Sequence, residues 1–199
     1  MEKLRNILSK IDIELSGLSY IADGRNDLSI ALLDVAIEHS KAIVVLIENS
    51  LYASSYALVR PMFESFIRAV WIQDCANDEQ IARIREKDEF PLSLGRILES
   101  VEKVKDWPGT LSNIKKVALK NMHSYTHGGS QLIARRFENG DLVHAIDNEE
   151  LYGVKQFVSM LSFLSLNEII SIAKTPNKDH FIKELYDDVC RWYFSNNDQ

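Results

Sequence analysis

Apolar residues recur at helical spacing through most of this chain, in segments too long for strands. The clearest segments are residues 1–20, 28–49, 51–76 and 148–174. In each of them, apolar residues three and four positions apart gather on one face, which is typical of helices that pack against a core. The 199 residues include only four prolines and eight glycines, so long helices form more easily than a sheet with many turns.

This pattern predicts an all-α fold with a single domain over residues 1–199. Shorter helical patterns over 77–89, 91–105 and 111–126 lie between the long ones, and a last helix runs from Thr175-Pro176 to about Phe194. We expect a bundle of about six or seven helices, with the segment 148–174 as the central element of the core.

Residues that favour helix ends set the expected boundaries. Asn26 or Asp27 can cap the second helix, Thr110 the helix over 111–126, and Asn148 the long apolar helix. Pro61 either kinks the helix over 51–76 or begins its second part.

Residues 130–146 fit two different structures. Ser130 can start a helix over 131–138, after a left-handed cap at Gly128-Gly129. Asn139-Gly140 is instead the strongest short hairpin dipeptide, with 133–137 and 142–146 as its arms. We favour the helix.

Several classes of protein are not expected from this sequence. The N-terminus leads into mixed charge rather than an apolar secretory segment, and polar residues interrupt the most apolar region, 154–173. Cys75 and Cys190 lie far apart and form no metal-ligand spacing, and no glycine-rich phosphate loop is present. We expect a cytoplasmic protein without a membrane span, metal or cofactor.

Charge is unevenly distributed along the chain. The formal net charge is −6, which argues against indiscriminate binding to nucleic acid. Residues 107–137 nevertheless contain five basic residues and no acid, while the rest of the chain has 18 basic and 29 acidic residues. The five are Lys115, Lys116, Lys120, Arg135 and Arg136. This segment is the expected place for an anion.

Two histidines within this basic segment could act in acid–base catalysis. His123 and His127 are four residues apart and share a helix face with Lys116 and Lys120. One neutral and one protonated imidazole can act as base and acid while lysines neutralise a phosphate. That combination fits metal-independent RNA cleavage, in which a 2′-hydroxyl attacks its own phosphodiester. The alternative is that His127 caps its helix and His123 is merely exposed.

A second polar group lies on the helix over 51–76. Arg60, Glu64 and Arg68 follow one another at intervals of four residues. They form either an ion-pair ladder at the edge of the packed face or, with Arg60 and Glu64, a polar pocket between helices.

Both groups belong to segments that resemble known families. The sequence Arg60-Pro61-Met62-Phe63-Glu64, together with residues 124–129 (SYTHGG), resembles a group of uncharacterised bacterial all-helical proteins with R-P-x-x-E and S-Y-x-H-G-G segments. More distantly, it is similar to the HEPN superfamily. The resemblance covers residues 51–146. It implies a helical bundle that dimerises and, in active members, a metal-independent RNase of toxin–antitoxin, abortive-infection or other phage-defence systems.

The resemblance implies roles for six residues, but this sequence departs from the HEPN active-site pattern at one position. His127 is the general base or acid and His123 its partner; Lys116, Lys120 and Arg60 contact phosphate, and Glu64 orients an imidazole or Arg60. HEPN nucleases have four to six residues between this Arg and the histidine, whereas here Lys120, with six residues between it and His127, is the only cation in that range. Lysine neutralises a phosphate but cannot bind it in the bidentate way arginine does.

The competing hypothesis is a non-catalytic dimerisation or protein-interaction module. Arg60, Glu64 and His127 then form a buried polar network that holds helices in register. The partners expected from the two hypotheses together are a second copy of the chain, RNA, and a partner protein such as an antitoxin.

Overall fold

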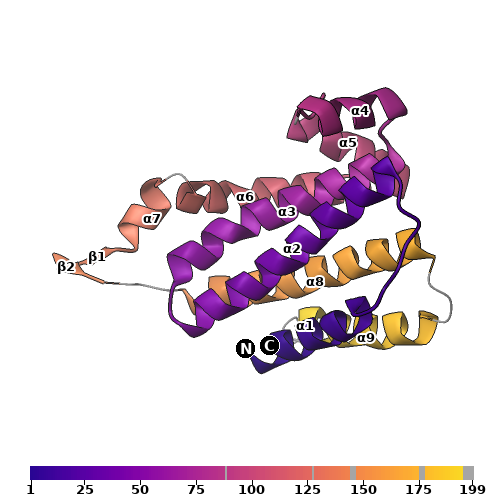
Figure 1. Cartoon of the computed structure of the whole chain (residues 1–199). Helices are drawn as coiled ribbons and strands as arrows, with labels where there is room; N and C mark the ends of the chain where they lie inside the picture. The colour runs from indigo at the N-terminus through magenta and orange to yellow at the C-terminus, as the bar shows by residue number, and fades with distance from the viewer. Residues whose placement is uncertain (88, 127, 144–146, 175–177, 195–199) are drawn as a thin grey trace.

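The structure is a computed structural model that describes residues 1–87, 89–126, 128–143, 147–174 and 178–194 (Figure 1). Within these ranges, the side chains of 117–123, 126, 131, 193 and 194 are not described. The described residues form nine helices and one small hairpin: α1 (Glu2–Leu15), α2 (Gly24–Glu48), α3 (Tyr52–Asp74), α4 (Asp78–Lys87), α5 (Leu94–Lys105), α6 (Thr110–Thr126), α7 (Ser130–Ala134), β1 (Phe137–Glu138), β2 (Asp141–Leu142), α8 (Asn148–Ala173) and α9 (Asp179–Phe194).

The predicted all-α fold is confirmed, but the predicted helix count of about six or seven is too low. α4 and α5, of 10 and 12 residues, correspond to the helical patterns predicted over 77–89 and 91–105, and α7 is a helix of 5 residues within the segment 130–146. α3 is a single helix that contains Pro61, so the proline does not begin a second helix.

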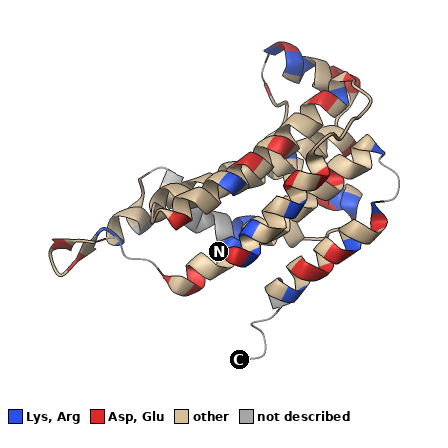
Figure 2. Cartoon of the chain, turned by 60° about the horizontal axis from the view of Figure 1, so that its bottom comes forward, with Lys and Arg blue, Asp and Glu red and all other residues tan. Residues whose placement is uncertain are grey.

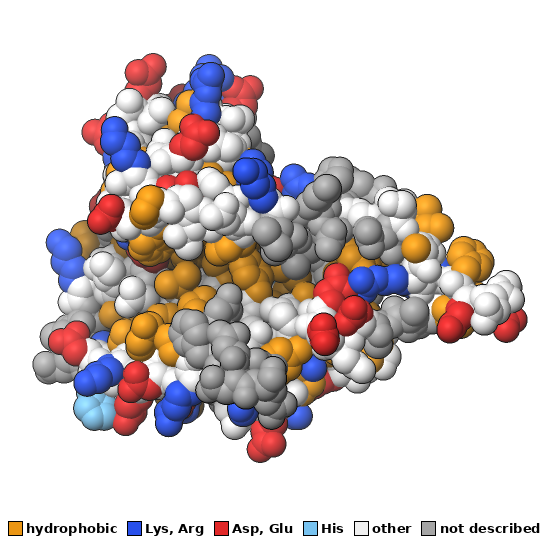
Figure 3. All heavy atoms as spheres, turned by 180° about the vertical axis from the view of Figure 1, so that it is seen from behind, with side chains coloured by type: hydrophobic (Ala, Val, Ile, Leu, Met, Phe, Trp, Pro, Cys, Tyr) orange, Lys and Arg blue, Asp and Glu red, His pale blue; other side chains and the backbone are white. Residues whose placement is uncertain are grey.

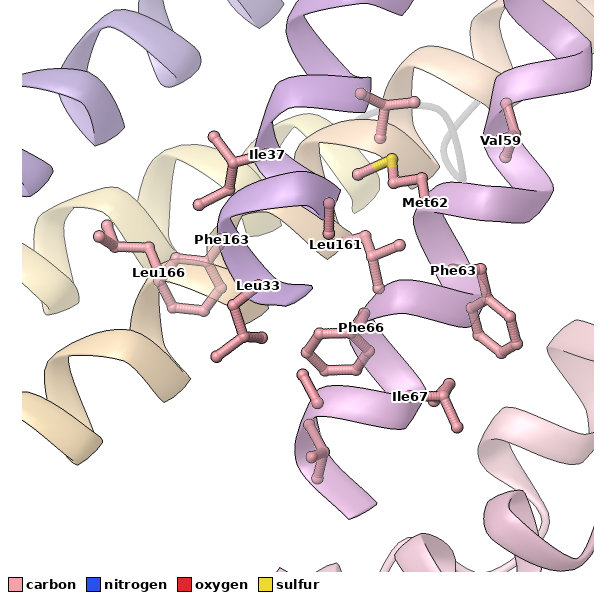
Figure 4. Close-up of a cluster of buried hydrophobic side chains, with 14 of the residues drawn as sticks. Leu33, Ile37, Val59, Met62, Phe63, Phe66, Ile67, Leu161, Phe163 and Leu166 are labelled. Atoms are coloured by element: carbon pink, nitrogen blue, oxygen red, sulfur yellow. The ribbon is translucent and has the colours of Figure 1, made fainter. Parts of the chain in front are cut away.

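The core forms where α2, α3 and α8 lie against one another. α3 packs against α2, α5, α6 and α8, and α8 packs against α1, α2, α3 and α9. Figure 4 shows Met62 and Phe66 of α3 among Leu33 and Ile37 of α2 and Leu161 of α8, and all five are buried. Burial of each such side chain contributes about 1.5–3 kcal/mol, so this cluster provides the main driving force for folding.

Two aspartates cap the long helices, one position or more before the residues expected. Asp23 accepts hydrogen bonds from the backbone N–H groups of Arg25 and Asn26, at 2.9 and 2.7 Å. Asp147 does the same for the first turn of α8. The predictions of Asn26, Asp27 and Asn148 as caps were wrong, because each lies inside its helix. A carboxylate also interacts more favourably than an amide with the positive end of the helix dipole.

Thr110, too, was expected to cap the helix over 111–126. Instead it is the first residue of α6. The last helix begins at Asp179, and residues 175–177, where we expected its start, lie outside the described residues.

Hydrogen bonds from Arg25 and from buried serines join the long helices. The Arg25 guanidinium donates hydrogen bonds to the carbonyl oxygens of Ile72 and Ala76, at 2.6 and 2.7 Å, and so closes the carboxyl end of α3. Ser40 of α2 and Ser162 of α8 are buried and joined by a 2.7 Å hydrogen bond between their hydroxyls. Such small side chains let the two helices approach closely.

Residues 130–143 form an arm that projects from the bundle (Figure 1). The favoured helix over 131–138 is wrong beyond Ala134, and the alternative hairpin is present, with strands shorter than its expected arms 133–137 and 142–146. Asn139 and Gly140 have φ of 52° and 93°, the positive values that a two-residue type I′ turn requires. This local geometry ends the helix early.

One described helix, α8, has the length and mean hydropathy (1.4) of a membrane span. The core helices of soluble proteins share this character, and α8 packs against four other helices of the bundle. Its composition is therefore weak evidence for a membrane.

Candidate functional site

Four parts of the chain meet at the end of the bundle from which the arm projects. They are the start of α3, the end of α6, the residue after α7, and the start of α8. Tyr56 of α3 and Tyr125 of α6 contact each other edge to face, with ring centroids 4.9 Å apart and ring planes at 89°. This arrangement is favourable for aromatic pairs and fixes the end of α6 against α3.

An ion pair ties the base of the arm to the same place. The guanidinium of Arg135 pairs with the carboxylate of Glu150 on α8. Its central carbon lies over the Tyr125 ring, 5.6 Å from the centroid. Both side chains of the ion pair are about one-quarter exposed. We call Tyr56, Tyr125, Arg135 and Glu150 the tyrosine junction.

Burial sets the protonation of the two phenols. Desolvation, with a smaller contribution from the nearby Glu150 carboxylate, raises the pKa of Tyr125 to about 12 and raises that of Tyr56 as well. Both therefore stay neutral at physiological pH. Tyr56 is 2% exposed, and none of the described residues offers its hydroxyl a hydrogen bond. An unmatched buried hydroxyl of this kind lowers stability.

Two adjoining cavities run from the junction along the arm. The inner one, of about 200 Å³, is lined partly by Ser50, Tyr52 and Ser54 and by the arginines Arg135 and Arg136. The outer one, of about 460 Å³, has mainly apolar walls that include Ala57, Ile133, Phe137 and Leu142. Ala53, Ser54, Tyr125, Leu132 and Arg136 line both. We call the combined space the arm groove.

Arg60 and Glu64 form the predicted ion-pair ladder. The Nε of Arg60 donates to a Glu64 carboxylate oxygen at 2.8 Å, and the other oxygen lies 3.6 Å from an Arg68 nitrogen. Arg68 also lies over the ring of Phe90, 4.6 Å from its centroid. The Arg60 and Glu64 side chains are partly buried. The arginines that line the arm groove are Arg135 and Arg136, not Arg60.

The predicted histidines fall where side chains are not described. His127 lies outside the described residues; His123 and Lys120 lie on α6, but their side chains are outside the description. Lys116 is exposed on α6. Contacts of these residues with Arg60 and Glu64 remain a prediction.

Tyr56, Tyr125 and Glu150 were not among the residues predicted for the site. Their contacts join residues far apart in sequence, which periodicity cannot pair. Tyr125 alone carried a signal, because it is the tyrosine of the S-Y-x-H-G-G segment. Among the described residues, no group of three or more His, Cys, Asp or Glu side chains could hold a metal ion.

Comparison with known proteins gives one match. No curated protein and no solved structure matches the chain significantly. The model of a family of unknown function, DUF6988, matches residues 33–190, which include α3, α6, the arm and α8. The chain therefore belongs to the DUF6988 family.

Proposed function

We propose that the protein is a HEPN-like, RNA-targeting component of a bacterial toxin–antitoxin or phage-defence system. Its reaction is metal-independent cleavage of RNA, with His127 and His123 as the acid–base pair. The observation that carries the proposal is the contact between Tyr56 and Tyr125, which joins α3, one turn before its R-P-x-x-E segment, to the S-Y-x-H-G-G segment.

The geometry behind this step is simple. α3 and α6 run side by side in opposite directions (Figure 1). Arg60 lies one turn after Tyr56 on α3, and an α-helix rises about 1.5 Å per residue, so the α6 turn that precedes Tyr125 lies beside Arg60. His123 belongs to that turn, and His127 follows Tyr125 by two residues. The backbone arrangement thus supports proximity of Arg60 to the α6 turn that contains His123.

Charge supports the same assignment. Lys115 and Lys116 are exposed on α6, within a segment of 31 residues that has no acid. RNA binding relies on such clustered cations, because each neutralised phosphate releases counterions. The acidic remainder of the chain repels RNA and so directs it to α6.

Each of the proposed site residues has a role in one step of the reaction. One neutral imidazole removes the proton of the 2′-hydroxyl, whose oxygen then attacks the adjacent phosphorus. The protonated imidazole gives its proton to the 5′-oxygen that leaves, so the products are a 2′,3′-cyclic phosphate and a 5′-hydroxyl. Arg60, Lys116 and Lys120 stabilise the negative charge of the phosphate. Glu64 holds Arg60 in position through the 2.8 Å ion pair.

The test is incubation of the purified protein with total RNA and with tRNA in EDTA. His127→Ala is compared with His180→Ala, which removes an exposed histidine from α9. We expect the unmodified protein and His180→Ala to cut and His127→Ala not to cut, with equal circular dichroism spectra and melting temperatures. If none of the three cuts, the nuclease proposal is wrong.

A second candidate, the non-catalytic interaction module, has its own supporting observation. The arm exposes Ile133, Phe137 and Leu142, which are large apolar side chains. On this proposal His127 is structural, so His127→Ala lowers the melting temperature by several degrees and changes no RNA-cleaving activity. The partner is then a second copy of the chain or a separate protein such as an antitoxin.

A further inference from the structure

We propose that two copies of this chain exchange arms, so that the arm of each copy (residues 130–143) lies in the arm groove of the other. The inference concerns assembly and does not depend on RNA cleavage. It identifies the surface that joins the copies and the residues that form the contact.

Exposed apolar area on the arm is the first argument. Ile133, Phe137 and Leu142 are 55%, 60% and 71% exposed, although they lie within ten residues of one another. Figure 3 shows apolar side chains at the surface along this projection. Contiguous exposed apolar patches on soluble proteins mark interaction sites, because their hydration is unfavourable. The arm therefore needs a cover from outside its own chain.

The groove supplies a matching surface. The apolar walls of its outer part come from Ala53 and Ala57 of α3 and from the arm itself, so an arm that enters from a second copy packs against both. Its inner part adds serine and tyrosine side chains and two arginines. The described residues that line the groove include no carboxylate. The groove thus fits a segment that is apolar along its length and acidic at its tip.

The hairpin has this chemistry. Glu138 and Asp141 lie directly opposite each other at its tip, between Phe137 and Leu142. Like charges in this register repel each other. Among the described residues, no ion pair neutralises either carboxylate. A cation from outside the hairpin would relieve this repulsion.

The arm also carries the complementary charge at its base. Arg135 and Arg136 lie there, and Figure 2 shows acidic residues at the tip and basic ones at the base. Arg135 is paired with Glu150, which leaves Arg136 as the cation for the partner's tip. When two arms lie antiparallel, the tip of each reaches the base of the other. A two-fold axis repeats every contact, so one complementary arm builds the whole interface.

Charge reversal provides the sharpest test. One variant carries Arg136→Glu, and the other carries Glu138→Lys together with Asp141→Lys. We expect the unmodified protein to have twice the 22.8 kDa mass of the chain by analytical ultracentrifugation or light scattering. For each variant alone, the dissociation constant of the dimer should rise about ten-fold or more, because like charges then meet at two symmetric places.

An equal mixture of the two variants should regain the dimer mass. In that mixture every reversed base faces a reversed tip, so each contact is again between opposite charges. A substitution that merely unfolds the arm would not be rescued in this way. Arg96→Glu, which reverses an exposed arginine on α5, is the control for net charge.

The apolar contact is tested separately. Phe137→Ser should weaken dimerisation about ten-fold or more, since aromatic anchors account for much of the energy of an interface. Ile13→Ser, at a side chain 68% exposed on α1, should leave it unchanged. Equal melting temperatures of both variants would exclude a folding defect.

Three results would overturn the proposal: a monomer up to the limit of solubility, a dimer whose affinity none of the arm variants alters, or a mixture of variants that stays monomeric. The second result would place the interface on another face. The RNA assay tests the nuclease proposal separately from these three results. A protein that is monomeric and cuts RNA would refute arm exchange but support the nuclease proposal.

Discussion

The core and the arm use the same kinds of side chain in opposite ways. Phe66 on α3 is completely buried, whereas Phe137 at the start of the hairpin is 60% exposed. Core helices of 23 to 26 residues hold their apolar stripes against one another, while the hairpin has strands of two residues each. Apolar character alone therefore does not distinguish a core position from an interaction surface. What distinguishes them is whether the same chain supplies a partner.

The largest expected effect separates these two phenylalanines. Phe66→Ala should lower the free energy of unfolding by about 3–5 kcal/mol, since it removes a buried ring and leaves a cavity. Phe137→Ala should change it by less than about 0.5 kcal/mol in the monomer, because solvent already surrounds most of the ring. Urea unfolding at low protein concentration measures both. Equal losses would mean that the arm is part of the core.

The tyrosine junction, between the core and the arm, should make the protein sensitive to alkali. The pKa of Tyr125 is about 12 in the folded state and about 10 when unfolded, so the folded state holds this proton more tightly. Stability is then fully present below pH 10 and falls as the pH rises from about 10 to 12, by on the order of 2 kcal/mol.

Thermal melts between pH 9 and pH 12 follow this loss, with the pH range set by the Tyr125 pKa of about 12. Tyr125→Phe should make the profile less steep, because phenylalanine has no proton to lose, while the raised pKa of Tyr56 still contributes. Tyr52→Phe removes a phenol from the first turn of α3 and is the control. A profile that keeps its slope in Tyr125→Phe would show that another group is responsible.

The ion pair that joins arm and bundle should have an intermediate effect. Glu150→Ala leaves the Arg135 guanidinium, about one-quarter exposed, without its carboxylate, which should cost about 1–2 kcal/mol. Glu149→Ala removes the same charge from the same turn of α8 at an exposed position and should cost less. Chemical denaturation compares the two variants. If they behave alike, the arm is not held by this ion pair.

The smallest effect is expected at the ladder on α3. Glu64→Gln removes two i,i+4 ion pairs at partly exposed positions, each of which contributes about 0.3–0.5 kcal/mol. A melting experiment should show a shift of only a few degrees. A loss comparable to that of Phe66→Ala would instead support a buried network essential for the core.

Periodicity predicted the long helices because each buries an apolar face, and predicted face residues such as Ile43 and Phe66 are indeed buried. Cap positions were less predictable. Asn26 and Asp27 have the chemistry of caps, yet Asp23 starts the helix earlier with the same chemistry. Near helix starts, several residues can cap, and tertiary packing decides among them.

The arm and the tyrosine junction show where sequence reasoning stops. Asn139-Gly140 indicated the hairpin correctly, but a helical pattern upstream competed with it, and only the positive φ angles decide. The pairs Tyr56–Tyr125 and Arg135–Glu150 join residues distant in sequence. No local sequence pattern specifies such pairs, so only the three-dimensional structure identifies the residues that form the site.

Arg25 has a consequence for how much of the chain folds by itself. The family match starts at residue 33, but the side chain that closes the carboxyl end of α3 lies eight residues earlier, next to the Asp23 cap. A fragment cut at the start of the match would lose both, and with them α1, whose Leu4 and Ile11 are buried. We therefore expect the segment matched by the family model to be less stable by itself than the whole chain. Truncated variants should begin no later than residue 22, and they should be compared with a variant that also retains α1.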